Sequence, residues 1–129
     1  MNNTQKLFDL AAEAARNAYA PYSKFRVGAA LLADDGQFYA GCNVENISFP
    51  VGTCAEAGAI AAMIAGGGKK IKEILIFADS PRLISPCGAC RQRIAEFAEP
   101  QTTVYLADSS GIRKSCTVAE LLPFSFSEF

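Results

Sequence analysis

The sequence predicts an α/β fold in which helices layer a mixed β-sheet. Two extended segments joined by a short turn lie near the N-terminus, which is the pattern of an antiparallel hairpin. Later in the chain, helical and extended segments alternate, which favours parallel strands covered by helices. The chain has 129 residues with no internal repeat and no low-complexity linker. We therefore expect a single domain over residues 1–129.

The predicted fold begins with a helix. Apolar residues recur at helical spacing over residues 4 to about 19, and Pro21 ends the pattern. Residues 25–32 are extended and mostly apolar, and residues 37–44 form a second extended stretch. Between them, residues 34–36 read Asp-Asp-Gly, which is a turn sequence. The two extended stretches are therefore expected to pair as a hairpin.

Helices and strands alternate in the remainder of the chain. Small and apolar residues predict a helix over 55–65, and residues 74–78 form a short buried strand. A Ser-Pro pair suits the start of a helix over 87–98, and residues 102–107 supply another strand. The last expected elements are a short strand over 113–117 and one helical turn over 118–122.

Charge and hydropathy limit the partners of this chain. It has 12 basic and 13 acidic side chains, a formal net charge of −1, and no long run of Lys or Arg. A nucleic-acid partner is not expected, because polynucleotide binding uses clustered basic residues. No apolar stretch is long enough to span a membrane, and residues 1–9 lack the pattern of a signal peptide. We expect a soluble cytoplasmic protein with no membrane partner.

Histidine is absent, and cysteine occurs five times. In a cytoplasmic protein these thiols stay reduced, so metal binding or thiol chemistry is expected rather than a disulfide framework. The absence of histidine excludes Ser-His-Asp triads, Cys-His proteases and His-Glu-x-x-His metal sites, because each uses imidazole as a base or a ligand. A general base in this chain must be Glu, Asp, Lys or Tyr.

Three cysteines have the spacing of a metal site. Cys54 precedes one predicted helix, while Cys87 and Cys90 lie three positions apart at the start of another, which places both sulfurs on one face. Three thiolates can converge between two helix N-termini and hold one Zn²⁺ per chain, with the fourth position open for water. Zinc lowers the pKa of such a water to about 7. Glu56 can then carry the water's proton without binding the metal.

Taken separately, these motifs have other interpretations. Thr53 and Glu56 match a capping box, in which the glutamate satisfies a free backbone N–H. Cys87 and Cys90 alone equally suit a thioredoxin-like dithiol. Cys54 alone suits a small buried residue. The combination favours the catalytic zinc site.

A structural zinc protein is a further alternative. It would close the site with a fourth cysteine, either Cys42 or Cys116, and it would have no use for Glu56. We otherwise expect Cys42 and Cys116 to be small buried residues.

The sequences Cys54-Ala55-Glu56 and Pro86-Cys87-Gly88-Ala89-Cys90 resemble the two zinc motifs of the cytidine deaminase family. The resemblance covers nearly the whole chain. It extends to residues 22–25, 27–30, 41–46, 91–92 and 121–123. It implies a three-layer αβα fold with a mixed five-stranded sheet, and it implies a homotetramer with active sites near the subunit interfaces.

The resemblance also implies roles for residues outside the metal site. Asn43 and Glu45 would read the ribose hydroxyls, Phe25 would stack on the pyrimidine, and the Ala55 backbone would read the base edge. Phe126 matches a C-terminal aromatic residue that closes a neighbouring subunit's pocket. Core packing is the alternative for both phenylalanines.

The implied reaction is the hydrolytic deamination of cytidine and deoxycytidine to uridine and deoxyuridine, with release of ammonia, as in pyrimidine salvage. The alternative within the family is a deaminase of another cytosine-bearing nucleoside, such as a nucleoside antibiotic. Asn43 and Glu45 favour an ordinary ribose, because an amide and a carboxylate suit a sugar diol.

Two positions depart from the family pattern. Arg26 stands where many members have Pro, and Ala57 stands where members with three cysteine ligands commonly have Arg. Without that arginine, the thiolate site would be more electron-rich than the sites of its relatives. The alternatives are that residue 57 points away from the sulfurs, or that a distant arginine, such as Arg82 or Arg93, already reaches them.

Overall fold

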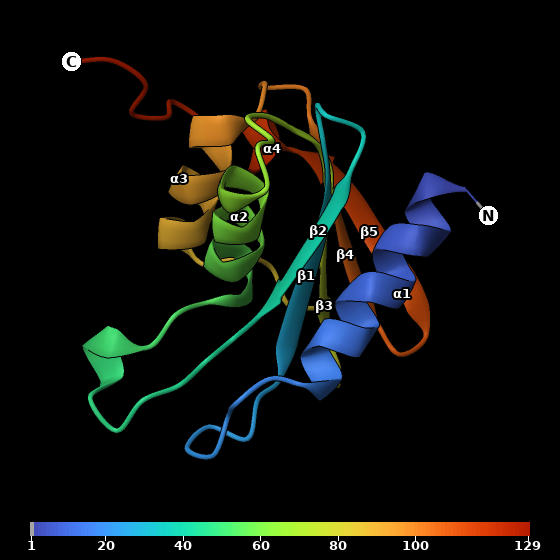
Figure 1. Ribbon diagram of the computed structural model, residues 1–129, viewed down its shortest axis with the longest axis vertical. Coiled ribbons are helices and arrows are strands. Elements are labelled where there is room, and N and C mark those ends of the chain that lie inside the picture. The colour runs from blue at the N-terminus through green and yellow to red at the C-terminus, as the bar shows by residue number, and fades with distance from the viewer. Residues whose placement is uncertain (1) are drawn as a thin grey trace.

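The protein folds around a five-stranded mixed sheet (Figure 1). The computed structural model describes residues 2–129. The strands are β1 (Val27–Ala33), β2 (Phe38–Cys42), β3 (Ile71–Ala78), β4 (Thr103–Asp108) and β5 (Gly111–Thr117). Their order across the sheet is β2-β1-β3-β4-β5, in which β3 and β4 are parallel and the other neighbouring pairs are antiparallel.

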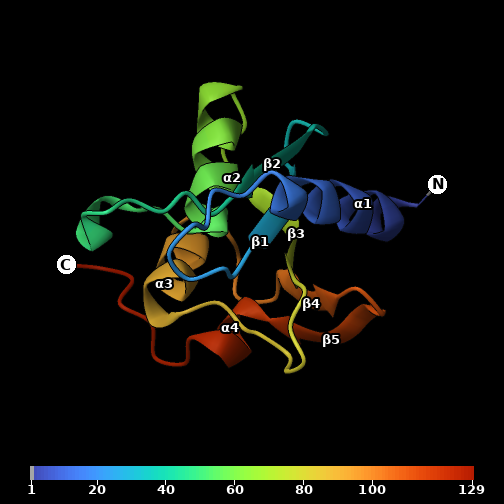
Figure 2. The same ribbon diagram turned by 90° about the horizontal axis from the view of Figure 1, so that it is seen from below.

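Helices cover both faces of the sheet. The helices are α1 (Asn3–Arg16), α2 (Ala55–Ala65), α3 (Gly88–Phe97) and α4 (Val118–Leu121), with a short 3-10 turn, η1 (Phe49–Val51), ahead of α2. Figures 1 and 2 show α1 on one side of the sheet and α2 and α3 on the other, with the C-terminal segment ending on the side of α3. The predicted three-layer αβα fold with a mixed five-stranded sheet is therefore confirmed.

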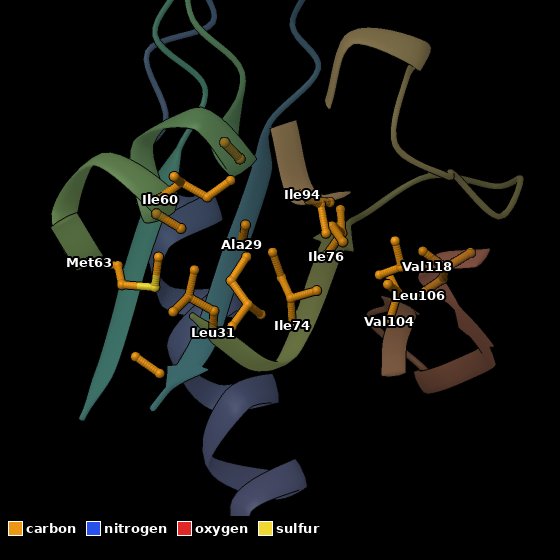
Figure 3. Packing of buried hydrophobic residues seen from close by; sticks show 14 residues of the cluster. Ala29, Leu31, Ile60, Met63, Ile74, Ile76, Ile94, Val104, Leu106 and Val118 are labelled. Atoms are coloured by element: carbon orange, nitrogen blue, oxygen red, sulfur yellow. The ribbon is translucent and has the colours of Figure 1, made fainter. Parts of the chain in front are cut away.

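The core has two parts that meet the two faces of the sheet. The larger part lies between the sheet and α2, α3 and α4, and Figure 3 shows Met63 and Ile94 in this layer with Leu31 of β1. The smaller part lies under α1, where Leu7 packs in one cluster with Ala30. Because side chains alternate along a strand, the neighbours Ala30 and Leu31 belong to opposite layers. Strand β1 is thus buried on both faces of the sheet, which explains why its sequence is a nearly continuous apolar run.

Two glycines let helices lie directly on the sheet. A Cβ atom at Gly28 would overlap the carbonyl oxygen of Ala11 in α1, and a Cβ at Gly41 would overlap the backbone nitrogen of Ala59 in α2. Overlaps with backbone atoms cannot be relieved by a side-chain rotation. These glycines therefore fix how closely α1 and α2 approach the sheet.

Some element boundaries differ from the predicted ones. Helix α1 ends at Arg16 rather than near Tyr19. The Asn17 N–H donates to the Ala14 carbonyl and the Ala18 N–H to the Ala15 carbonyl, which closes the final turn. Tyr19 then donates its N–H to the Asn43 carbonyl, outside the helix. Strand β1 begins at Val27 rather than at residue 25. The backbone of Lys24 has a φ of 61°, a left-handed conformation that interrupts an extended chain.

The other differences are small. Strand β3 begins at Ile71, three residues before the predicted strand, because Ile71 pairs with Ala33 across an irregularity in the register. The turn η1 was not predicted from the sequence. Within residues 2–129, no helix has the length and apolar character needed to cross a membrane.

Candidate metal centre and active site

The topology places the starts of two helices at one edge of the sheet. Strands β2 and β3 are both antiparallel to β1, so they run in the same direction. Helix α2 follows β2 and helix α3 follows β3 along the chain, and both helices pack on the same face. Both therefore begin beyond the carboxyl ends of their strands, which is where open α/β sheets form their binding sites.

The predicted metal ligands meet between these two helix starts. The sulfurs of Cys54, Cys87 and Cys90 all lie within 4.8 Å of one another. Cys54 and Cys87 are the N-cap residues of α2 and α3, and neither thiol caps its helix with a hydrogen bond. Cys90 lies in the first turn of α3 and is buried, whereas Cys87 is exposed. The three thiols are therefore available for a shared ligand.

The cluster fits a zinc ion. Zn–S bonds of about 2.3 Å in a tetrahedron separate the sulfurs by about 3.8 Å, which agrees with sulfurs within 4.8 Å of one another. Among residues 2–129, neither Cys42 nor Cys116 belongs to the cluster. Cys116 instead packs against the larger core and reaches the Val104 carbonyl. Three protein ligands leave one position open, as in catalytic zinc sites, whereas a structural site would be closed by a fourth cysteine.

The protein environment alone does not favour three thiolates. Burial raises the pKa of the Cys54 and Cys90 thiols, while the backbone N–H of Cys90 lowers the pKa of Cys87. Two of the three sulfurs therefore resist ionisation unless a cation is bound beside them. A divalent ion supplies that charge, since metal coordination deprotonates a thiol.

An arginine reaches the cluster from α3. The Arg93 Nη1 atom donates to the Cys90 Sγ atom at 3.3 Å. The site therefore has a neighbouring cation, although position 57, where the family resemblance implies Arg, is Ala57. Arg82, the other arginine considered from the sequence, donates its backbone N–H to Ser80 and is exposed. Of these two arginines, Arg93 is the one whose guanidinium reaches a clustered sulfur.

Glu56 lies beside the sulfurs and is almost fully buried, with 4% of its surface exposed. Burial raises the pKa of its carboxyl group, while its own backbone N–H, the Cys90 thiol and Arg93 oppose that rise. A raised pKa suits a carboxyl group that must both accept and return a proton.

The capping-box alternative for Glu56 is wrong. The N-cap of α2 is Cys54 rather than Thr53, and it has no side-chain capping bond. The Thr53 N–H donates to the Val44 carbonyl instead. Glu56 is therefore free of the structural role that its position in the sequence suggested.

A cavity of about 630 Å³ opens over the sulfurs and Glu56. The other predicted site residues on its wall are Phe25, Asn43, Glu45 and Ala55. Phe126 is not on this wall. It is 64% exposed, its ring packs edge-on against Phe129, and its carbonyl accepts a hydrogen bond from Gln92. The structure thus brings together every predicted site residue except Phe126.

Asn43 and Glu45 hold the loop that carries Phe25. The Asn43 side chain donates to the Phe25 carbonyl at 2.8 Å and accepts the Val27 N–H at 2.9 Å. Glu45 accepts the Ser23 hydroxyl and the Ser23 N–H, and these bonds lower the pKa of its carboxyl group. Both side chains therefore build the wall of the cavity as well as facing it.

Sequence reasoning did not assign roles to Ser23 and Arg91. Arg91 donates to the Pro86 carbonyl, the Ser85 hydroxyl and the Leu121 carbonyl, and so ties the loop before Cys87 to the end of α4. These partners are far apart in the sequence or in a loop of irregular shape. No spacing pattern could have found them.

A family comparison agrees with this geometry. The model of the family described as "Cytidine and deoxycytidylate deaminase zinc-binding region" matches residues 1–107, which include all three clustered cysteines and Glu56. This chain belongs to the cytidine and deoxycytidylate deaminase family. The expected family and the expected zinc cofactor are confirmed, because the matched region is zinc-binding and the three thiols fit one zinc ion per chain.

Individual members of the family are similar over most of the chain. The cytidine deaminase of Sporosarcina psychrophila is 45% identical over 126 residues, which cover 98% of this chain and 93% of that protein. The crystal structure of cytidine deaminase from Burkholderia pseudomallei has a TM-score of 0.89 and 38% identity, covering 98% of this chain and 100% of that one. Blasticidin-S deaminase of Bacillus cereus is 32% identical over 112 residues, covering 81% of this chain and 79% of that protein.

Replacing Cys54, Cys87 or Cys90 with Ser should remove or loosen the zinc, because a hydroxyl is a much weaker ligand for Zn²⁺ than a thiolate. Zinc content per chain, measured by atomic absorption after gel filtration, should fall from one in the parent protein. Cys42→Ser and Cys116→Ser are matched controls that should keep the metal. Full retention in all three ligand variants would contradict the assignment.

Proposed function

We propose that this chain hydrolyses the C4 amino group of cytidine and deoxycytidine, giving uridine or deoxyuridine and ammonia, in pyrimidine salvage. The observation that carries this proposal is the juxtaposition of three clustered sulfurs and the buried Glu56 carboxyl group at one cavity. A dithiol oxidoreductase would leave Cys54 and Glu56 without a role. The family membership and the similarity to cytidine deaminases support the same reaction.

The proposed ligands are Cys54, Cys87 and Cys90, and bound zinc would lower the pKa of water so that hydroxide is available at neutral pH. Glu56 takes a proton from the attacking water and delivers it to N3 of the ring as the C4–O bond forms. Glu56 then moves the second proton from the new hydroxyl group to the amino group. The C–N bond breaks, ammonia leaves, and C4 becomes a carbonyl carbon. The burial of Glu56 suits both transfers because it raises the pKa of the carboxyl group.

The walls of the cavity suit a cytosine nucleoside. Phe25, half-buried at the cavity, offers an aromatic face to the pyrimidine, and the Ala55 backbone lies at the start of α2 beside the ligand Cys54. Asn43 and Glu45 face the position of the sugar in this proposal. The Glu45 pKa is lowered, so its carboxylate stays ionised and can accept hydrogen bonds from hydroxyl groups. Asn43 and Glu45 therefore favour an ordinary ribose over the sugar of a nucleoside antibiotic.

We further propose that the chain is one domain and works as a homotetramer in the cytoplasm, with no nucleic-acid partner. Large apolar side chains are exposed near the cavity and in the C-terminal segment, among them Phe49 (74%), Val51 (63%) and Phe126 (64%). Contiguous exposed apolar groups mark interaction surfaces. A reducing compartment keeps the three zinc-binding thiols available.

Glu56→Gln should retain zinc and the fold and should lower kcat by at least about 10²–10⁴-fold, because an amide cannot accept and return a proton. Initial rates of the loss of cytidine absorbance measure the effect. Glu96→Gln, which changes an exposed carboxylate on α3, should leave kcat unchanged. A Glu56→Gln protein with intact zinc and near-normal kcat would exclude this proton carrier.

Glu45→Ala should lower kcat/KM for cytidine by at least about tenfold more than for free cytosine. The reason is that a site loses its preference for a hydroxyl-bearing substrate when the side chain that bonds the hydroxyl is removed. Steady-state rates with both substrates give the ratio. Ser23→Ala is the control, since it loosens the same loop but keeps the carboxylate. It should lower both values together. An unchanged ratio in Glu45→Ala would contradict sugar recognition by Glu45.

If Phe126 closes the cavity of a neighbouring subunit, inactive Phe126→Ala and Glu56→Gln chains should recover activity when they exchange subunits, because mixed oligomers contain complete sites. Activity is measured after mixing, and subunit exchange is shown by native mass spectrometry. Phe124→Ala, a change at a fully exposed neighbour, should need no such rescue. Proven exchange without recovery would place Phe126 outside a shared site.

A further inference from the structure

The loaded metal site has an excess of negative charge. Three thiolates and one Zn²⁺ carry one net negative charge, and Cys90 holds part of it in the buried interior. A charge in a buried position is costly unless an opposite charge or hydrogen-bond donors lie beside it. The chain must therefore provide a cation near these sulfurs, and position 57, the expected place for it, is alanine.

We propose that Arg93 is a positioning residue that offsets the charge of the zinc thiolates and so controls metal retention. This inference rests on the zinc site of the proposed function. Arg93 Nη1 donates to Cys90 Sγ at 3.3 Å, and a guanidinium is always protonated in proteins. A charge-assisted hydrogen bond of this kind stabilises the thiolate as a ligand and draws electron density from its sulfur.

Helix geometry makes positions 93 and 57 equivalent. Arg93 follows the ligand Cys90 by three positions on α3, and Ala57 follows the ligand Cys54 by three positions on α2. Residues three apart share a helix face, and side chains lean toward the helix N-terminus. A long side chain at either position can therefore reach back to the sulfur of its own helix.

The other arginines near the site have different roles. Arg91 directly follows Cys90, but its guanidinium donates to two carbonyls and one hydroxyl rather than to sulfur. Arg82 is exposed in the loop before α3, and its hydrogen bond is made by the backbone N–H. Within residues 2–129, Arg93 is the arginine whose guanidinium bonds to a clustered sulfur.

The test measures the metal site directly. In Arg93→Gln, Zn²⁺ should transfer to an excess of a coloured chelator about tenfold faster, as expected from the loss of a charge-assisted hydrogen bond made by an exposed side chain. In the Co²⁺-substituted protein, the sulfur-to-cobalt charge-transfer band should move to longer wavelength, because the thiolate electrons are less stabilised. A purely structural role for Arg93 would not shift this band.

Two further variants separate charge from packing. Ala57→Arg combined with Arg93→Gln should restore slow zinc transfer and the original band position, because the cation returns on α2. Arg82→Gln, the matched control, should change neither measurement. A double variant that keeps its circular dichroism spectrum but behaves like Arg93→Gln would overturn the charge role.

Unchanged transfer rates and an unchanged cobalt band in Arg93→Gln would likewise overturn the inference. If Arg93→Gln does not fold, Arg93→Lys provides the test, since it keeps the charge with a single ammonium in place of the planar fork. The rate of zinc transfer from Arg93→Lys should be close to that of the parent protein. A rate as high as that of a cysteine ligand variant would contradict the charge role. A negative result for Arg93 does not contradict the proposed function, provided that replacing Cys54, Cys87 or Cys90 still removes the zinc.

Discussion

The site depends on the convergence of two helix starts at one edge of the sheet. That convergence follows from strand direction, since β2 and β3 run the same way and each leads into a helix on the same face. The contact of Gly41 with the backbone of α2 sets the distance between that helix and the sheet. A side chain at Gly41 would push α2 outward and carry Cys54 and Glu56 away from the sulfurs of α3.

The electrostatics of the site follow from this placement. Two thiols and one carboxyl group are taken out of water, and burial raises the pKa of each. In the function proposed above, zinc would stabilise the thiolates, Arg93 would offset the remaining charge, and Glu56 would exchange protons. Asn43 and Glu45, on the wall of the cavity, differ from these groups because loop hydrogen bonds rather than burial hold them in place. The thiols and Glu56 thus lie at helix starts, whereas Asn43 and Glu45 are tied to a loop.

The sequence predicted the parts that have a local pattern. The combination of Cys54, Cys87, Cys90 and Glu56 predicted the metal cluster, and the order of helices and strands predicted the fold. The family resemblance pointed to Asn43 and Glu45, which lie on the same cavity. Contacts between distant segments were not predictable: the Ser23 bond to Glu45 joins residues 22 positions apart. The end of α1 was misplaced because Tyr19 pairs with a loop far along the chain. Likewise, only the folded chain could decide between Arg82 and Arg93.

The closeness of the three sulfurs has a consequence for the protein when it loses its metal. Thiols that lie within 4.8 Å of one another are near enough for small backbone movements to join two of them as a disulfide once an oxidant is present. Cys87 is the most accessible of the three, and its lowered pKa makes it the first target of such an oxidant. Bound zinc would therefore also protect the cluster, and we expect metal-free protein exposed to an oxidant to lose the ability to rebind the metal.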